Sequence, residues 1–96
     1  SAHEASYVAL RERPDVLLLD VDMPHFTGLE LHECLRFTER GRNIPVIYVS
    51  GSVSPAEHQI AFRQGAKAFI RKPFDPQTLI DAIRSVLDGR CANLHT

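Results

Sequence analysis

Three polar residues of the kind that handle phosphoryl groups follow short apolar runs in the sequence. Asp20 ends the run formed by residues 16–19, Ser50 ends a second run, and Lys72 comes just after a third. A carboxylate can attack phosphorus, while a hydroxyl and an ammonium can contact the oxygens on which negative charge accumulates. If the three runs are neighbouring parallel strands, these side chains meet above one edge of the sheet. The pattern predicts a site that receives a phosphoryl group, although an acid that merely ends a strand and starts a turn would look the same in isolation.

The three apolar runs have the length and composition of buried strands. Residues 16–19 are four aliphatic residues bounded by Pro14 and Pro24, which is too short for a helix. Such a run suits a strand that is buried on both faces, as in a parallel sheet. Residues 44–49 and 68–70 predict two further strands of the same kind.

Helical patterns alternate with these strands. We expect helices over residues 2–12, 28–40, 54–65 and 76–88. The first has Ala5, Val8 and Ala9 on one side. The second begins with a capping box of Thr27 and Glu30 and ends at Gly41.

The third helix begins with Ser54 as its cap, and the fourth begins with Asp75-Pro76 and carries an apolar stripe. The stripe consists of Leu79, Ile80, Ile83, Val86 and Leu87. Alternation of helix and strand is typical of an α/β domain with a parallel sheet covered by helices on both faces.

Composition and charge exclude several function classes. The 96 residues form one domain at most, with 44% hydrophobic and 24% charged residues. The net charge of -1 comes from interspersed acids and bases without a basic run, which argues against nucleic-acid binding. No membrane span or signal peptide is recognisable, so the sequence predicts a cytoplasmic protein.

The cysteines and histidines do not predict a metal or redox site. Cys34 and Cys91 lie outside any Cys-x-x-Cys spacing, and Cys34 is expected to be a reduced thiol in the core. None of the five histidines forms a ligand pair at helical spacing.

Three motifs, in this order and spacing, resemble the receiver domain of bacterial two-component response regulators. They are Pro-Asp-Val-Leu-Leu-Leu-Asp-Val-Asp-Met-Pro followed by Gly28, then Ile-Pro-Val-Ile-Tyr-Val-Ser-Gly, then Gly-Ala-Lys-Ala-Phe-Ile-Arg-Lys-Pro-Phe. The resemblance covers residues 3 to about 88. It implies a flavodoxin-like, doubly wound parallel sheet, and a signalling module rather than an enzyme.

The resemblance also implies roles for the residues above. Asp20 would be the phospho-acceptor, taking a phosphoryl group from the phosphohistidine of a sensor histidine kinase. The carboxylate of Asp20 and the backbone carbonyl of Asp22 would ligate Mg²⁺. Ser50 would be the switch hydroxyl and Lys72 the phosphate-contacting lysine.

Further positions of the family pattern concern the switch and the loops. Phe69 matches the switch aromatic, and would swing inward when Ser50 moves toward the phosphate, reshaping the face made by the last two helices and the last strand. A plain core aromatic is the alternative for this position. Pro73 would follow Lys72 through a cis peptide bond, and Pro24 and Gly28 would be structural.

The sequence departs from the family at its start. The family begins with a strand that carries an acidic pair for Mg²⁺, then a helix and a second strand, and no such pattern precedes residue 3. We therefore interpret residues 1–88 as a partial receiver domain, with only strands 3, 4 and 5 of the family sheet, and residues 89–96 as a tail or the start of a linker. Strand 16–20 would then be an exposed edge, which predicts a dimer or exchanged assembly and weak or absent Mg²⁺ binding.

Two other functions fit parts of the pattern. A receiver-like module that works without phosphorylation would account for the absent acidic pair. A phosphatase of the haloacid dehalogenase type would use Asp20 as nucleophile and Asp22 as general acid and base. The receiver family accounts better than this phosphatase family for Met23-Pro24 and for Lys-Pro-Phe. Hydrolysis of a generic phosphomonoester that depends on Asp22 would indicate the phosphatase.

Overall fold

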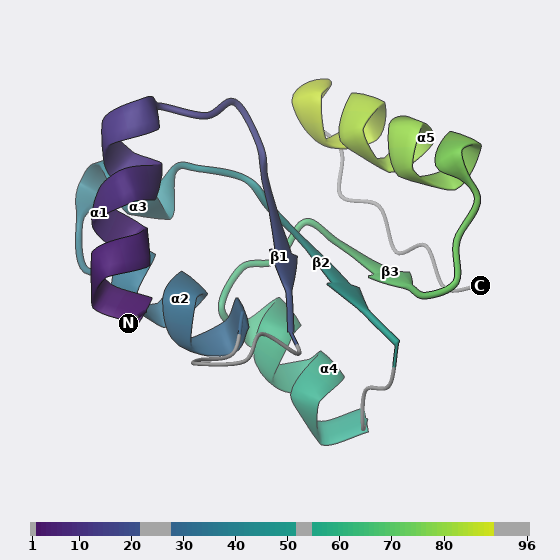
Figure 1. Ribbon diagram of the computed structural model, residues 1–96, viewed down its shortest axis with the longest axis horizontal. Coiled ribbons are helices and arrows are strands. Elements are labelled where there is room, and N and C mark those ends of the chain that lie inside the picture. Colours follow the sequence, from purple (N-terminus) through teal and green to yellow (C-terminus); the bar gives the residue numbers. More distant parts are fainter. Residues whose placement is uncertain (1, 22–27, 52–54, 90–96) are drawn as a thin grey trace.

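The computed structural model describes residues 2–21, 28–51 and 55–89 of the chain. Helices and strands alternate along it, with one additional short helix (Figure 1). In chain order they are α1 (Ala2–Glu12), β1 (Leu17–Asp20), α2 (Gly28–Leu35), α3 (Glu39–Arg42), β2 (Val46–Ser50), α4 (Pro55–Arg63), β3 (Ala68–Arg71) and α5 (Pro76–Leu87).

The three strands form a parallel sheet in the order β1-β2-β3. Asp20 lies opposite Val49 of β2, and Ser50 lies opposite Arg71 of β3. This register brings the carboxyl ends of all three strands to one edge of the sheet. The predicted α/β class with a parallel sheet is confirmed.

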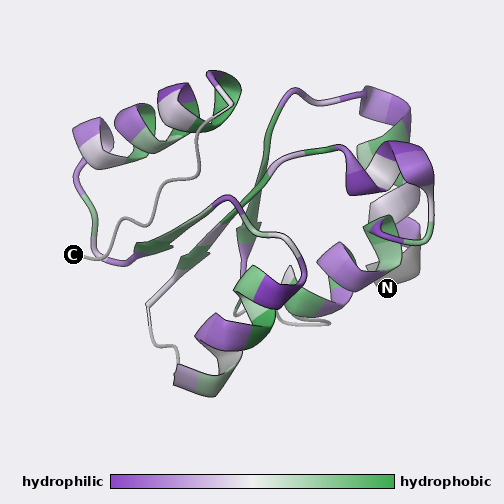
Figure 2. Ribbon diagram, turned by 180° about the vertical axis from the view of Figure 1, so that it is seen from behind, coloured by the Kyte–Doolittle hydropathy of each residue, from purple (hydrophilic) through white to green (hydrophobic). Residues whose placement is uncertain are grey.

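Helices cover the sheet unequally on its two faces (Figure 1). α2 and α4 lie on one face, with α1 packed on α2, whereas α5 lies alone on the other face. The strands are largely apolar up to their polar carboxyl ends, and the helices carry both apolar and polar residues (Figure 2). The larger core, on the α2 and α4 face, contains Leu19, Val21, Leu31, Leu35, Val46, Tyr48, Ala61, Ala66 and Phe69. The smaller core, beneath α5, contains Ile47, Ala68, Ile70, Ala82 and Val86.

The expectation of one continuous helix over residues 28–40 is wrong. α2 ends at Leu35, and α3 begins after Thr38, whose hydroxyl accepts a hydrogen bond of 2.9 Å from the backbone N–H of Gly41. The chain turns so tightly here that a Cβ on Gly41 would lie 2.0 Å from the carbonyl oxygen of Leu35. Thr38 is therefore the N-cap of α3, because its short side chain competes for backbone donors.

The outer elements are partly exposed. The apolar run of β1 suggested burial on both faces, whereas its expected place at the edge of the sheet implied exposure. Leu18 of this strand is 39% exposed. On α1, Ala5 and Ala9 pack against the larger core, whereas Val8 is exposed. Cys34 is a free thiol that is only half-buried, so its expected place in the core is also wrong.

The last helix begins as predicted, with Asp75 as its N-cap and Pro76 in its first turn. The Asp75 carboxylate accepts a 2.8 Å hydrogen bond from the backbone N–H of Thr78, and this bond lowers the pKa of Asp75. Of the predicted apolar stripe, Ile80 and Leu87 are exposed and the remaining members pack on the sheet.

Several expectations fall outside the described residues. They concern the caps at Thr27 and Ser54, the loop residues Asp22 and Pro24, and the tail from residue 90 onward. Within the described ranges, none of the helices has the length and apolar character that crossing a membrane requires.

Candidate functional site

Asp20 and Lys72 meet above the carboxyl edge of the sheet. Asp20 is the last residue of β1, and Lys72 follows directly after β3. The ammonium Nζ of Lys72 donates to Oδ2 of Asp20 at 2.6 Å, so the two charges form a close ion pair. The Asp20 side chain is 40% exposed and the Lys72 side chain is 42% exposed. The carboxylate at the end of β1 is therefore partly exposed and paired with a cation.

Ser50 lies between these two positions, at the end of the central strand. Its backbone carbonyl accepts a 2.7 Å hydrogen bond from the N–H of Lys72, which fixes the residue that follows β3 against the end of β2. The Ser50 residue is completely buried. The strand register places all three predicted residues at one edge of the sheet.

Phe69 lies inside the protein in this structure. It is 4% exposed and belongs to the larger core, on the face covered by α4. Its ring centroid lies 4.7 Å from that of His58 and 6.0 Å from that of Tyr48. In the described state Phe69 is therefore packed inside the core.

Two backbone features shape the edge around Asp20. The peptide bond between Lys72 and Pro73 is cis. A Cβ on Gly28, the first residue of α2, would lie 2.9 Å from the carbonyl oxygen of Asp20, which is closer than real Cβ atoms come. Only glycine lets α2 begin this close to the end of β1.

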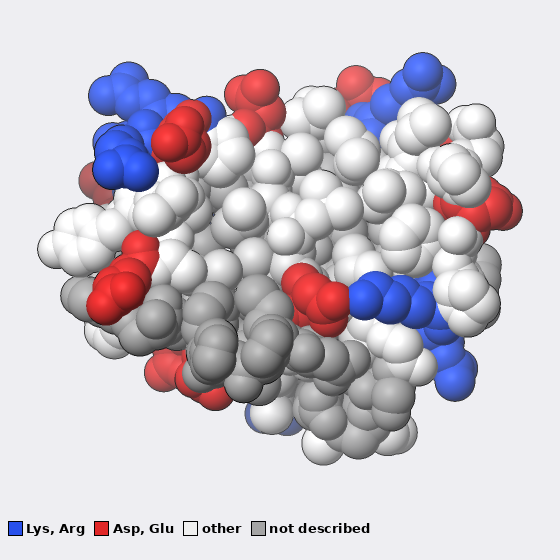
Figure 3. Space-filling view, viewed as in Figure 1, with Lys and Arg blue, Asp and Glu red and all other residues white. Residues whose placement is uncertain are grey.

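Carboxylates that could hold a metal are few at this edge. Among the described residues, no group of three or more His, Cys, Asp or Glu side chains is placed to bind an ion. Asp20 supplies one carboxylate, while Asp22 lies outside the described residues. On the face seen in Figure 3, acidic and basic side chains are interspersed and no large area of one sign stands out.

Sequence reasoning missed a buried polar network on the α2 and α4 face. Nδ1 of His32 lies 2.7 Å from the hydroxyl of Tyr48, and this hydroxyl also lies 3.4 Å from Oε1 of Gln64. Burial, and secondly the charge of Arg36, lower the pKa of His32 to about 4. Burial also raises the pKa of Tyr48. No local sequence pattern predicts this network, because its members come from three separate segments.

Comparison with known proteins identifies the family. Residues 1–84 match the response regulator receiver domain. The chain belongs to this family. Receiver domains of response regulators are generally signalling modules that interact with histidine kinases, and this receiver chain has their flavodoxin-like fold.

Relatives and solved structures agree with this assignment. The receiver chain is 33% identical over 84 residues to the polar-differentiation response regulator DivK of Brucella anthropi, covering 88% of this chain and 68% of DivK. The chemotaxis protein CheY4 of Vibrio cholerae superposes with a TM-score of 0.79 at 31% identity, covering 90% of this chain and 72% of CheY4. A DNA-binding response regulator of the LuxR family from Staphylococcus aureus gives a TM-score of 0.79 at 28% identity, with 91% and 71% coverage.

Proposed function

We propose that this receiver domain accepts a phosphoryl group on Asp20 from the phosphohistidine of a sensor histidine kinase. The observation that carries the proposal is the accessible Asp20 carboxylate, held 2.6 Å from Nζ of Lys72 at the carboxyl edge of a parallel sheet. A carboxylate oxygen attacks phosphorus, the phosphorus–nitrogen bond of the donor breaks, and the departing imidazole nitrogen keeps the electron pair and takes up a proton. Lys72 then pairs with the phosphoryl oxygens, where the negative charge develops.

Mg²⁺ belongs to this proposal, with the carboxylate of Asp20 and the backbone carbonyl of Asp22 as ligands from this chain. The donor set suits the ion, because Mg²⁺ typically takes one or two carboxylates together with phosphate oxygens and water. When bound, it would neutralise charge on the phosphoryl oxygens. Because the described residues include no group of three or more potential ligands, we expect weak binding before the phosphoryl donor arrives.

The readout proposed for phosphorylation is packing around Phe69. Ser50 is buried at the end of β2, and Phe69 is buried one strand away, so a movement of the Ser50 hydroxyl toward a phosphoryl group would change the space beside β3. Because Phe69 has no hydroxyl, its contribution is through packing alone. Phosphorylation would favour the inward state only to the extent that it interacts better with that state than with others. The surface formed by α4, β3 and α5 is the expected output face.

The edge strand is the proposed contact with other chains. Within the described sheet β1 has a neighbour on one side, β2, and its Leu18 is 39% exposed. Such an edge favours strand pairing, so we expect a dimer or an exchanged assembly. The partial receiver domain over residues 1–88, the tail over 89–96 and a cytoplasmic setting remain predictions of the sequence.

The test is the intact mass of the chain after incubation with acetyl phosphate and Mg²⁺. We expect a gain of one phosphoryl group that is absent in Asp20→Asn and strongly slowed in Lys72→Met. The matched control is Asp15→Asn, because Asp15 is an exposed aspartate that precedes the start of β1, whereas Asp20 ends this strand.

Two outcomes would contradict the proposal. Phosphorylation that persists in Asp20→Asn would place the acceptor elsewhere. A complete lack of phosphorylation in the folded wild-type chain, at saturating Mg²⁺, would favour the alternative of a receiver-like interaction module that works without phosphorylation.

A further inference from the structure

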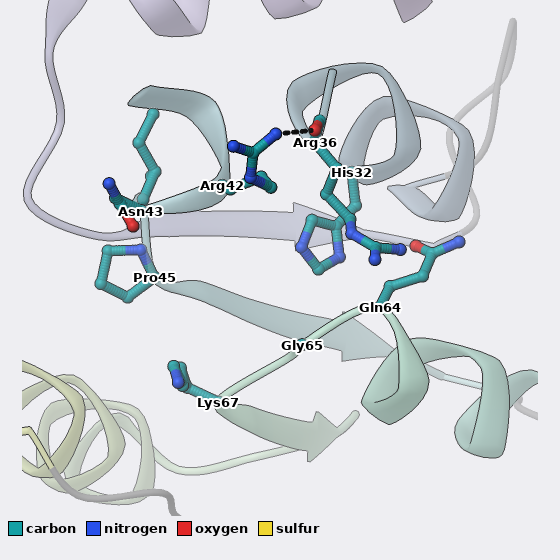
Figure 4. A pocket seen from close by; sticks show the side chains of 9 residues that line it. His32, Arg36, Arg42, Asn43, Pro45, Gln64, Gly65 and Lys67 are labelled. Atoms are coloured by element: carbon teal, nitrogen blue, oxygen red, sulfur yellow. Dashed lines mark hydrogen bonds between the residues drawn. The ribbon is translucent and has the colours of Figure 1, made fainter. Parts of the chain in front are cut away.

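A basic pocket lies at the end of the sheet opposite to Asp20. Its volume is about 290 Å³. Asn43, Gln64 and Lys67 line it shortly before β2 and β3 begin, whereas Asp20 and Lys72 lie where strands end. The pocket is therefore separate from the predicted phosphorylation site. Figure 4 shows the residues that line it.

Three cationic side chains from three segments line this pocket. Arg36 follows the end of α2, Arg42 ends α3, and Lys67 precedes β3. The described lining residues include no Asp or Glu. In a chain with 11 basic and 12 acidic residues that are interspersed, a pocket lined by one sign of charge departs from the general pattern. A concave surface of this kind concentrates anions.

The charge of Arg36 acts on His32, which also lines the pocket, and on Tyr48, which contacts His32. It contributes, after burial, to the lowered pKa of His32, and it opposes the effect of burial on the pKa of Tyr48. An anion bound in the pocket would be attracted by the positive charge of Arg36.

The pocket is partly organised in advance. Nη1 of Arg42 donates to the carbonyl oxygen of Arg36 at 3.3 Å, which ties α3 to the end of α2 (Figure 4). The Tyr48 hydroxyl donates a hydrogen bond to Oε1 of Gln64, and it also contacts Nδ1 of His32. Arg36 extends toward Gln64, and Lys67 lies across the pocket on the strand side (Figure 4). Preorganised donors bind a ligand with a smaller entropic cost.

The alternative to ligand binding is that these cations stabilise the ends of helices. Basic side chains near a helix C-terminus interact favourably with the helix dipole and with the last backbone carbonyls. Arg42 does contact a backbone carbonyl. That role does not account for Lys67, which precedes a strand and lies on the opposite wall of the same pocket.

We propose that this pocket binds a compact phosphate compound through Arg36, Arg42 and Lys67. Guanidinium groups match the geometry of phosphate oxygens and can bind two of them at once. The volume is at the lower limit of small-molecule pockets, so it suits a ligand with one or two phosphate groups and little else.

The experiment is calorimetric titration of the folded chain with inorganic pyrophosphate, at low ionic strength and without Mg²⁺. We expect a dissociation constant below about 1 mM. Arg36→Gln, Arg42→Gln and Lys67→Gln should each weaken binding about fivefold or more. The matched control is Arg84→Gln, which removes the same charge from the exposed surface of α5 on the other face of the sheet and should leave the affinity within about twofold of wild type.

Further arms locate the site and separate ligand sources. Amide NMR signals of Gly65 and Lys67 should shift on titration, those of Lys72 should not, and Asp20→Asn should bind as wild type does. Parallel titrations with inorganic phosphate and glycerol phosphate distinguish a free phosphate from a phosphate ester. Equal weakening by Arg84→Gln and by the pocket variants, or no binding at about 10 mM pyrophosphate, would overturn the proposal. Because Asp20 takes no part, the outcome is independent of the phosphorylation test.

Discussion

The buried imidazole of His32 makes the stability of this receiver domain depend on pH. His32 is 4% exposed, contacts the Tyr48 hydroxyl at 2.7 Å and lies within the field of Arg36. Burial, and then Arg36, lower its pKa from 6.5 to about 4. The folded protein therefore holds His32 neutral under conditions in which the unfolded chain would protonate it.

The sign of the effect follows from proton linkage. Above pH 6.5 the imidazole is neutral in both states, and its contribution to stability is fully present. As the pH falls toward 4, the unfolded chain binds a proton that the folded chain does not, so the free energy of unfolding decreases. The shift corresponds to roughly 3 kcal/mol in total, of which about 2 kcal/mol is lost by about pH 5. This is a large part of the stability of a small domain.

The contribution of His32 to the free energy of unfolding can be measured by urea unfolding. The wild type and His32→Gln are each unfolded at several pH values between about 8 and 4.5. Gln keeps a polar amide near Tyr48 and does not titrate. The other ionisable groups are common to both proteins and cancel in the difference. The stability advantage of the wild type should therefore shrink by about 2 kcal/mol between about pH 8 and about pH 5.

A difference between the two proteins that is constant over this range would refute the reasoning, because it would mean that His32 titrates alike in the folded and unfolded states. A wild-type advantage that grows as the pH falls would give the opposite sign, and would indicate that the folded protein favours the charged imidazole. Arg36→Gln provides a second check, since removing this charge should raise the pKa of His32 and flatten the pH dependence.

Two further predictions concern the edge of the sheet. Gly28→Ala should lower the free energy of unfolding by about 1–3 kcal/mol and slow phosphorylation of Asp20, because its Cβ would meet the Asp20 carbonyl at 2.9 Å. Urea titration and intact mass measure both effects, and Gly51→Ala, whose Cβ would lie 3.8 Å from that of Lys72, should change them little. Leu18→Lys should weaken self-association, measured by light scattering, whereas Val8→Lys on α1 should not; a wild-type chain that is monomeric at about 100 µM would contradict the proposed edge pairing.

Local sequence signals were sufficient for the strands and for the ends of several helices. Short apolar runs bounded by prolines and glycines predicted all three strands, and Asp75-Pro76 predicted the start of α5. The same logic failed over residues 28–40. There, apolar periodicity continued through a point at which Thr38 captures a backbone donor and Gly41 permits a turn too close for a side chain.

By itself, the sequence determined that Asp20, Ser50 and Lys72 follow strands, and a parallel sheet places such positions at one edge. Tertiary structure alone decided the rest. The 2.6 Å distance within the expected pair of Asp20 and Lys72, the contact of His32 with Tyr48, and the pocket that Arg36, Arg42 and Lys67 line all depend on residues from separate segments. Periodicity and capping are properties of neighbouring residues, whereas these contacts depend on how helices cross over the sheet, which no local pattern encodes.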